Sequence, residues 1–440
     1  MVELSQHRFD ERTRTTSMEI FEGLLPAKVR FRDAPLLKVR FVDVGQGDGA
    51  IVDTPGGRIL LIDGGEAQHI RNYIGRAYGH ILARSPLHCD AVVVTHGDAD
   101  HFAGLTKLVQ ASRKDGSPLI TADRVFHNGL VKRTVEKDRD AFGKVLEADG
   151  QVYAVDLKDD LTAVPDAQMN EPFRAWKKAL KRLKGANSKL RVQRLTYGNH
   201  EPFAFLADEG IRVHVLGPIA DAVRGQPALR FLHTPGGKAL SASHTVNGHS
   251  IVLRLTYGNA RILFGADLNA EAEERLLQRA SADGISLTAE VLKVPHHGSA
   301  DFSPRALEAV HPVVSVISSG DENVSKEYIH PRAGLVGALG RYSRGTVEKP
   351  LIYVTEMVAF FERVGDVAVK GTGQLVANGK VLDGIHNAYR KRTFGIVHVR
   401  TDGKRVLVVT HSAKDDQKES YAFRVDERGG VEFENRTRIV

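Results

Sequence analysis

Short runs of apolar residues bounded by glycine, asparagine and aspartate dominate the first part of the chain, as is typical of β-strands. They predict strands over residues 37–44, 49–54, 58–62 and 91–94. The last of these runs, Ala91-Val92-Val93-Val94, has no polar alternation, which favours a strand covered on both faces. Residues 66–84 and 102–113 predict helices.

The strand pattern returns after residue 210, whereas residues 114–210 are less regular. Strands are predicted over residues 211–216, 250–257, 261–264, 291–294 and 313–318. Helices are predicted over residues 270–283, 304–310 and 333–342. Two halves that each run from strands into alternating strands and helices predict an α/β protein with helices packed outside its sheets.

The length of 440 residues exceeds what one simple core holds. We expect an N-terminal arm over residues 1–36 and a main domain over residues 37–345, with an insertion at about residues 114–210. Residues 349–440 predict a small β-rich C-terminal domain or an extra sheet docked on the main body. Their strands are predicted at residues 351–361, 395–399, 406–410 and 421–425.

Charge and composition narrow the function classes only slightly. The net charge of +7 suits an anionic substrate such as nucleic acid or a phosphoester. Cys89 is the only cysteine, which excludes an intrachain disulfide and is compatible with a reducing compartment. The charged start of the chain has no apolar signal-peptide core, and no run of about 18 apolar residues appears. We therefore expect a cytoplasmic protein with no membrane partner, and its oligomeric state stays open.

The most informative chemistry follows the strand at 91–94. Two imidazoles and two carboxylates lie within the seven residues Thr95-His96-Gly97-Asp98-Ala99-Asp100-His101. Without a cation, four such side chains on one turn would repel or desolvate one another. Nitrogen and oxygen donors on a tight loop can converge on divalent ions. We interpret the stretch as a metal site rather than as a polar loop with incidental histidines.

Further donors accompany other predicted strands. His249 precedes the strand at 250–257, Asp267 follows the strand at 261–264, and His296 follows the strand at 291–294. His330 lies before Pro331. Loops at strand ends that gather at one edge of a sheet are where such sites are usually built, so these residues are candidates to complete the centre.

The same segments carry a family resemblance. The chain resembles the metallo-β-lactamase-fold hydrolases, and in particular it is similar to the soluble nuclease-like domain of competence (DNA-uptake) channel proteins. The matching segments lie within about residues 37–345 and are Val42–Asp48, Leu61–Gly65, the His96–His101 loop with Ala103-Gly104-Leu105, Phe264–Asp267, His296–Ser299, Ser318–Asn323 and His330-Pro331. The membrane segments of those channels are missing, so a transport role is not implied.

The resemblance implies an αββα sandwich with a two-metal site at one edge. By analogy, one metal takes His96, Asp98 and His249, the other takes Asp100, His101 and His296, and Asp267 bridges them. His249 is either a ligand or a surface histidine before a strand. Because the donors include no thiolate, they suit Zn²⁺, Mn²⁺ or Fe²⁺, and Asp98 in place of the superfamily's second histidine favours Mn²⁺.

Other residues have supporting roles in this interpretation. Asp63 either accepts a hydrogen bond from a ligand histidine or caps a turn. His297 and His330 either contact a phosphoryl oxygen or protonate the leaving group, or one of them is a metal ligand. With Asp100, these two histidines are the candidate catalytic residues. Ser299 and Asn323 are weaker candidates for phosphate contacts.

Two cations about 3.5–4 Å apart can activate water and stabilise both oxygens of a phosphodiester displacement, so we expect a metal-dependent phosphodiesterase, most simply a nuclease. The basic segment at residues 173–184, extended by Lys189, Arg191 and Arg194, predicts either a phosphate-binding face or an ordinary exposed helix face. The alternatives are a hydrolase of a small or lipid-linked ester and a non-enzymatic binding or assembly protein on the same fold.

Overall fold

The computed structural model describes residues 35–234, 239–320, 330–344, 350–356, 360–368, 375–377, 380–382, 385–393, 395–411 and 418–438. The predicted arm at residues 1–36 lies outside these ranges except for its last two positions, and Asn323 also lies outside them.

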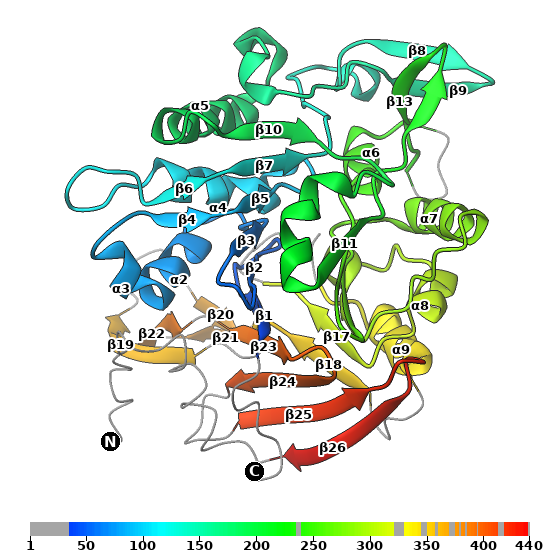
Figure 1. The fold of residues 1–440 in the computed structure, drawn as a ribbon. Coiled ribbons are helices and arrows are strands. Elements are labelled where there is room, and N and C mark those ends of the chain that lie inside the picture. The colour runs from blue at the N-terminus through cyan, green and yellow to red at the C-terminus, as the bar shows by residue number, and fades with distance from the viewer. Residues whose placement is uncertain are drawn as a thin grey trace.

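Two large sheets form the body of the protein (Figure 1). In spatial order, the ten-stranded sheet consists of β10 (Arg191–Arg194), β7 (Arg124–His127), β5 (Ala91–Val93), β3 (Ile59–Ile62), β2 (Ala50–Asp53), β1 (Leu37–Val42), β23 (Ile396–Thr401), β24 (Arg405–His411), β25 (Lys418–Val425) and β26 (Val431–Arg438). The six-stranded sheet consists of β11 (Ile211–Val215), β14 (Leu253–Tyr257), β15 (Ala260–Phe264), β16 (Val291–Lys293), β17 (Val314–Ile317) and β18 (Leu351–Val354).

Neighbouring apolar residues of one strand serve two different cores, because successive side chains of a strand point to opposite faces. Val93 and Leu60 join the core between the two sheets, whereas Val92 and Leu61 join a second core beneath outer helices. The unbroken apolar run at 91–94 is therefore a strand buried on both faces, as its pattern predicts.

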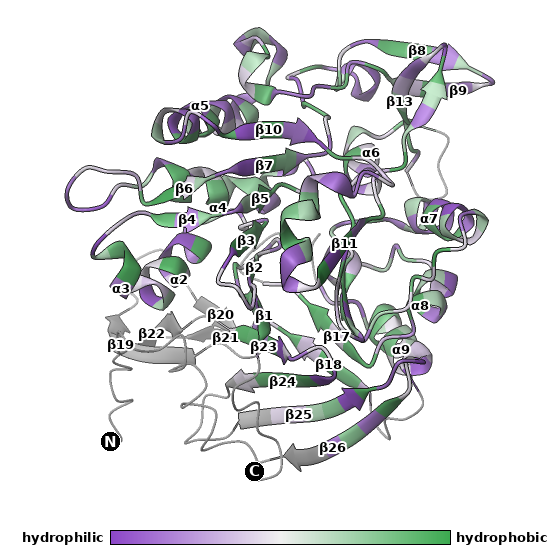
Figure 2. Cartoon of the chain, viewed as in Figure 1, coloured by the Kyte–Doolittle hydropathy of each residue, from purple (hydrophilic) through white to green (hydrophobic). Residues whose placement is uncertain are grey.

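Helices cover the outer face of each sheet. On the ten-stranded sheet these are α2 (His69–Ala77), α4 (Ala99–Gln110) and α5 (Glu171–Ala186). On the six-stranded sheet they are α7 (Ala270–Ala282), α8 (Pro304–Val310) and α9 (Ala333–Tyr342). Figure 2 shows hydrophobic and hydrophilic bands alternating along helices such as α5 and α7, as expected for helices with one buried face. This layering confirms the predicted αββα sandwich.

The C-terminal part is rich in strands, as predicted, and much of it continues the first sheet. β23 pairs antiparallel with β1 along that strand's whole length, from Leu37 opposite Thr401 to Val42 opposite Ile396. Val399, Val408 and other apolar residues of these strands join the core between the sheets. Two smaller pairs, β19 (Phe360–Ala368) with β22 (Ile385–Thr393) and β20 (Leu375–Ala377) with β21 (Lys380–Leu382), precede them. The predicted domain boundaries stay predictions.

The less regular region contributes β9 (Gln151–Ala154) and β8 (Val145–Ala148) to a four-stranded sheet, whose other strands, β12 (Asp221–Val223) and β13 (Gln226–Arg230), follow that region in the chain, as does the neighbouring α6 (Ala242–Gly248) (Figure 1). It also contributes β6 (Ile120–Ala122), which pairs with β4 (Leu87–Cys89). Among the described residues, none of the helices combines the length and apolarity needed to cross a bilayer.

Candidate metal centre

The loop from β5 to α4 carries the first set of donors. Val94 to Asp98 connect the strand to the helix, and Asp98 is the extended residue before the first helical turn. α4 begins at Ala99, three residues before the predicted start at Phe102, so Asp100 and His101 lie in its first turn. The sequence prediction was wrong at this boundary because the density of charged side chains resembles a loop, whereas an extended Asp favours a helix start directly after it.

Glycines allow this loop to pack tightly against its neighbours. A Cβ on Gly47 would lie 1.8 Å from the carbonyl oxygen of Asp100, and Gly47 has a φ of +111°. A Cβ on Gly97 would lie 2.8 Å from the ring of Phe173, which belongs to α5. These contacts fix the position of the loop from both sides, since a side chain at either glycine would displace it.

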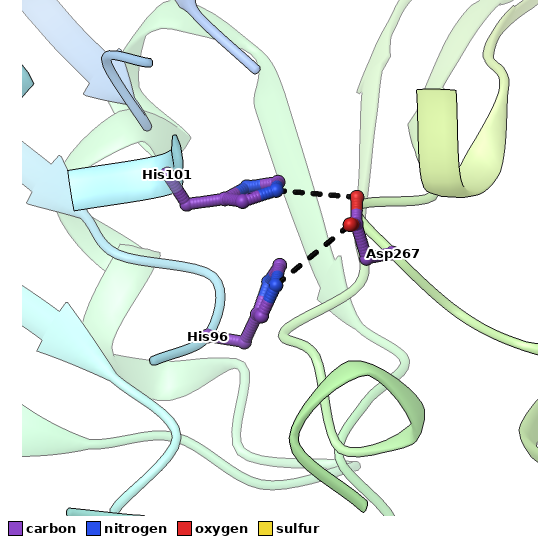
Figure 3. A group of neighbouring side chains, drawn as sticks. All are labelled: His96, His101 and Asp267. Carbon is purple, nitrogen blue, oxygen red and sulfur yellow. Dashed lines mark ion pairs between the residues drawn. The ribbon is translucent and has the colours of Figure 1, made fainter. Parts of the chain in front are cut away.

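Asp267 is the centre of the cluster. It follows β15 across a left-handed Ala266, whose φ is +48°. Its Oδ1 lies 3.3 Å from His101 Nε2, and its Oδ2 lies 3.8 Å from His96 Nε2 (Figure 3). The same Oδ2 lies 3.1 Å from Nε2 of His297, which follows β16. The ends of three strands from two sheets thus bring three imidazoles to one carboxylate.

Asp100 and Asp48 extend the cluster on the side of His297. Asp100 Oδ2 lies 3.7 Å from His297 Nε2, and Asp48 Oδ1 lies 3.3 Å from His297 Nδ1. The buried ammonium of Lys293 forms an ion pair with Asp48 and donates to the carbonyl oxygen of Ala266 at 3.2 Å. The glycine-rich segment that holds Asp48 is part of the family resemblance, but the sequence alone assigned no role to Asp48 or Lys293.

Each of the three imidazoles is held by its Nδ1 atom. His101 Nδ1 lies 2.8 Å from Asp63 Oδ2, and His297 Nδ1 lies 3.0 Å from the carbonyl oxygen of Ser318. His96 Nδ1 lies 3.2 Å from Thr95 Oγ1, whose hydroxyl donates to Asp63 at 2.6 Å. Acceptors at Nδ1 favour the tautomer in which Nε2 has a free lone pair, which is the form that binds metal.

The Nε2 atoms of His96, His101 and His297 are buried and make no hydrogen bond within the described part of the chain, and the same holds for Asp267 Oδ1. Buried polar atoms without partners are costly and rare. They face one another instead, and the donor atoms of His96, His101 and Asp267 lie within 4.8 Å of one another. Three imidazole nitrogens and carboxylate oxygens fit Zn²⁺ or Mn²⁺, so these residues fit a metal centre.

The electrostatics of the cluster lead to the same conclusion. Burial opposes charge on every member, yet the carboxylates of Asp267 and Asp63 raise the pKa of His101 well above its usual value. For His297, burial is likewise outweighed by Asp267, and the pKa rises to about 10. For Asp267, burial is outweighed by His297 and His101, which hold its pKa well below the usual range. The carboxylates therefore require positive charge between the imidazoles, which protons or a metal ion can supply.

Other predicted ligands lie elsewhere around the centre. Within the described residues, the groups of three or more close donor atoms do not include Asp98, His249, His296 or His330. His249 Nε2 lies 2.7 Å from the carbonyl oxygen of Arg230, to which it donates. His296 Nε2 contacts the Asn247 side chain at 3.3 Å, and the His296 ring is 6.1 Å from that of His330. His296 and His297 both have a left-handed backbone, with φ of +49° and +52°. It is therefore His297, and not the adjacent His296, whose ring lies beside Asp267.

The basic segment around α5 is largely engaged with the protein itself. Its ion pairs join Lys177 to Asp166 (2.7 Å), Lys184 to Asp160 (2.7 Å) and Arg194 to Asp159 (3.1 Å). Lys178 and Lys181 are exposed. A phosphate-binding face on this helix therefore stays a prediction.

Comparisons with known proteins find matches to parts of this chain. Residues 42–160 match the family described as the metallo-beta-lactamase superfamily. Competence protein ComA of Neisseria gonorrhoeae is 41% identical over 86 residues, which are 19% of this chain and 12% of that protein. Two solved structures also match: a mutant of CmlA beta-hydroxylase (12% identity, TM-score 0.32, 78% of this chain and 59% of that chain) and a long form of RNase Z from yeast (7% identity, TM-score 0.27, 64% and 37%).

The matched residues include β2 to β7 and the loop from Thr95 to His101, and they supply His96, Asp100 and His101 to the cluster. Asp267 and His297 come from the second half of the sandwich, which completes the layered fold. Residues 42–160 thus match the metallo-β-lactamase superfamily, whose members have a hydrolase-type fold and typically bind divalent metals, and the layered fold and the donor cluster are consistent with this match.

Proposed function

We propose that this protein is a metal-dependent phosphodiesterase that cleaves nucleic acid. The observation that carries the proposal is the convergence of three buried imidazoles, each held at Nδ1, on the carboxylate of Asp267. Zn²⁺ or Mn²⁺ held there would activate a water molecule and stabilise the negative charge that develops on a phosphodiester during its hydrolysis. No nucleophile from the protein is needed for this reaction.

The side chains next to the cluster suit the remaining steps. Asp100 is a partly exposed carboxylate of the cluster, with 25% of its side chain accessible, and in this proposal it holds the metal and accepts a hydrogen bond from the attacking water. Burial lowers the pKa of His330 to about 4, so this imidazole is neutral near pH 7 and can donate an N–H to a phosphoryl oxygen. In this proposal His297 holds the metal, and His330 positions the substrate.

Two further observations support a polyanionic substrate. The chain has a net charge of +7, which favours approach of nucleic acid through long-range attraction. The relative that is 41% identical over 86 residues is a competence protein, a name that fits the handling of DNA. The match covers only 12% of the length of that relative. DNA or RNA as the substrate of this chain is therefore a proposal.

The test is hydrolysis by the full chain loaded with Mn²⁺ or Zn²⁺, using single- and double-stranded DNA, RNA and a small chromogenic phosphodiester. We expect strand cleavage that Asp267→Asn lowers by at least about 10³-fold, as expected for loss of a central group of the site. The matched control is Asp115→Asn, the same change at an exposed carboxylate outside the cluster.

Turnover of the small ester alone would replace nucleic acid by a small phosphoester as the substrate. Absence of any hydrolysis by protein shown to contain metal would refute the enzymatic proposal. Equal loss of activity in Asp267→Asn and Asp115→Asn would show that the measured cleavage does not come from this centre.

A further inference from the structure

We infer that the two metal positions of this centre are unequal, and that the ammonium of Lys132 takes the place of a cation at the second one. The inference rests on the proposed function only in assuming that the cluster binds divalent metal. It concerns the number and the affinities of the bound ions, which do not depend on the substrate.

We call the position beside Asp100 and His101 the first, and the position beside His96 and Asp98 the second. The first position has a full set of ligands from the protein. The donor atoms of Asp100, His101 and His297 lie within 4.8 Å of one another, and Asp267 Oδ2 reaches His297 Nε2 at 3.1 Å. Asp63 and Ser318 hold the two imidazoles from behind. Two imidazoles and two carboxylates satisfy the four ligands that a divalent transition metal takes from protein.

At the second position, both oxygens of Asp98 are already engaged by protein donors. The ammonium of Lys132 forms an ion pair with Oδ1. The amide nitrogen of Asn247 donates to Oδ2 at 2.9 Å in the orientation in which the amide oxygen accepts from His296. His96 Nε2, which faces the same carboxylate, is 3.9 Å from Oδ2.

The third donor expected at this position is directed elsewhere. His249 directly follows α6, and its Nε2 donates to the carbonyl oxygen of Arg230 at 2.7 Å. Its own carbonyl oxygen accepts from the side chain of Asn128 at 3.0 Å, which fixes the backbone as well. The donors left at the second position are therefore His96, Asp267, which also contacts the first position, and Asp98, whose charge is neutralised by Lys132.

Lys132 is held where it is by the surrounding structure. Its carbonyl oxygen accepts from the backbone N–H of Asn170 at 2.8 Å, and Asn170 caps the start of α5. The side chains of Lys132 and Asp98 are 24% and 20% accessible, so the pair is only partly screened by water. A divalent ion that binds Asp98 must displace the ammonium and be repelled by it at short range, which weakens that site.

The test is a calorimetric titration of Mn²⁺ into metal-stripped full-length protein, with metal content checked after gel filtration. It is made in a His88→Ala background, so that the exposed donor group of His88, Asp90 and Asp123 does not contribute. We expect one tight ion and a second that binds at least 10-fold more weakly. Lys132→Met should tighten the second site by 10-fold or more and leave the first unchanged.

The control is Lys178→Met, which removes an exposed lysine of α5 and should change neither affinity. Two equally tight ions in the His88→Ala protein would overturn the inference, as would a second affinity that Lys132→Met leaves unchanged. If Lys132→Met does not fold, Lys132→Gln takes its place, because the slightly shorter amide side chain keeps a polar end but removes the charge. Unequal sites in a protein that hydrolyses no phosphodiester would refute the proposed function while supporting this inference.

Discussion

Asp63 is the residue whose change best tests how the centre is held. It is fully buried, with a φ of +57°, and accepts three hydrogen bonds: from the N–H of Thr95 (2.8 Å), from the hydroxyl of Thr95 (2.6 Å) and from His101 Nδ1 (2.8 Å). Asparagine is the suitable replacement, since it has the same shape and tolerates a left-handed backbone. Asp63→Asn removes the charge and one of the two acceptor oxygens.

Neither orientation of the new amide preserves the site. If its nitrogen faces His101, Nδ1 must become an acceptor, and Nε2 then carries the proton and cannot bind metal. If its nitrogen faces the Thr95 N–H instead, two donors oppose each other, which costs about 1–3 kcal/mol of stability. Loss of such a supporting partner typically lowers metal affinity by about 10- to 100-fold, or about 1.4–2.7 kcal/mol.

The assay is a competition between protein and a chelator for Zn²⁺ at pH 7, together with chemical denaturation of the metal-free proteins. Asp160→Asn is the matched control. Asp160 also accepts from the N–H and the hydroxyl of one threonine, Thr162 (2.8 and 2.7 Å), and from a cation, Lys184, but it is partly exposed and outside the centre. We expect this control to leave the affinity for Zn²⁺ unchanged.

An unchanged affinity for Zn²⁺ in Asp63→Asn would refute the argument that Asp63 sets the tautomer of His101. A loss of stability with no loss of affinity would reduce Asp63 to a structural residue. A similar loss of affinity in both variants would point to a general effect of the substitution rather than to the bond with His101.

Three further predictions concern other parts of the fold. Burial raises the pKa of Glu273 to about 8 from an ordinary value near 4.5, so the folded protein keeps a proton that the unfolded chain releases between these pH values, and stability falls as the pH rises through that window. Glu273→Gln should therefore stabilise the protein by up to about 5 kcal/mol at pH 9 and by little at pH 5 in denaturation experiments, and equal effects at both pH values would contradict this. Gly47→Ala should destabilise the protein by more than about 3 kcal/mol and lower its metal content, because the new Cβ would meet the carbonyl of Asp100. The control Gly225→Ala, at a glycine with open space around it, should cost only about 1 kcal/mol. Similar losses of stability in the two variants would refute the role of the close contact. Cys89 is buried and burial raises its thiol pKa, so a thiol reagent should label it only after denaturation, and rapid labelling of the folded protein would disprove its burial.

The sequence by itself determined the fold class and the place of the chemistry. Unbroken apolar runs such as 91–94 predicted strands buried on both faces, and Val92 and Val93 do serve two cores. Dense donors after that strand, with Asp267 after another, indicated a metal centre at the strand ends. These features are local, because side-chain periodicity and ligand chemistry are written in neighbouring residues.

Only the tertiary structure decided which donors face one another. His296 and His297 are adjacent in the chain, and their left-handed backbone turns His297 toward Asp267. The backbone carbonyl of Arg230 engages His249, and Lys132 engages Asp98. The pairing of β23 with β1, more than 350 residues apart in sequence, also has no local signal. Contacts of this kind depend on backbone angles and long-range packing, which one sequence does not encode in any short pattern.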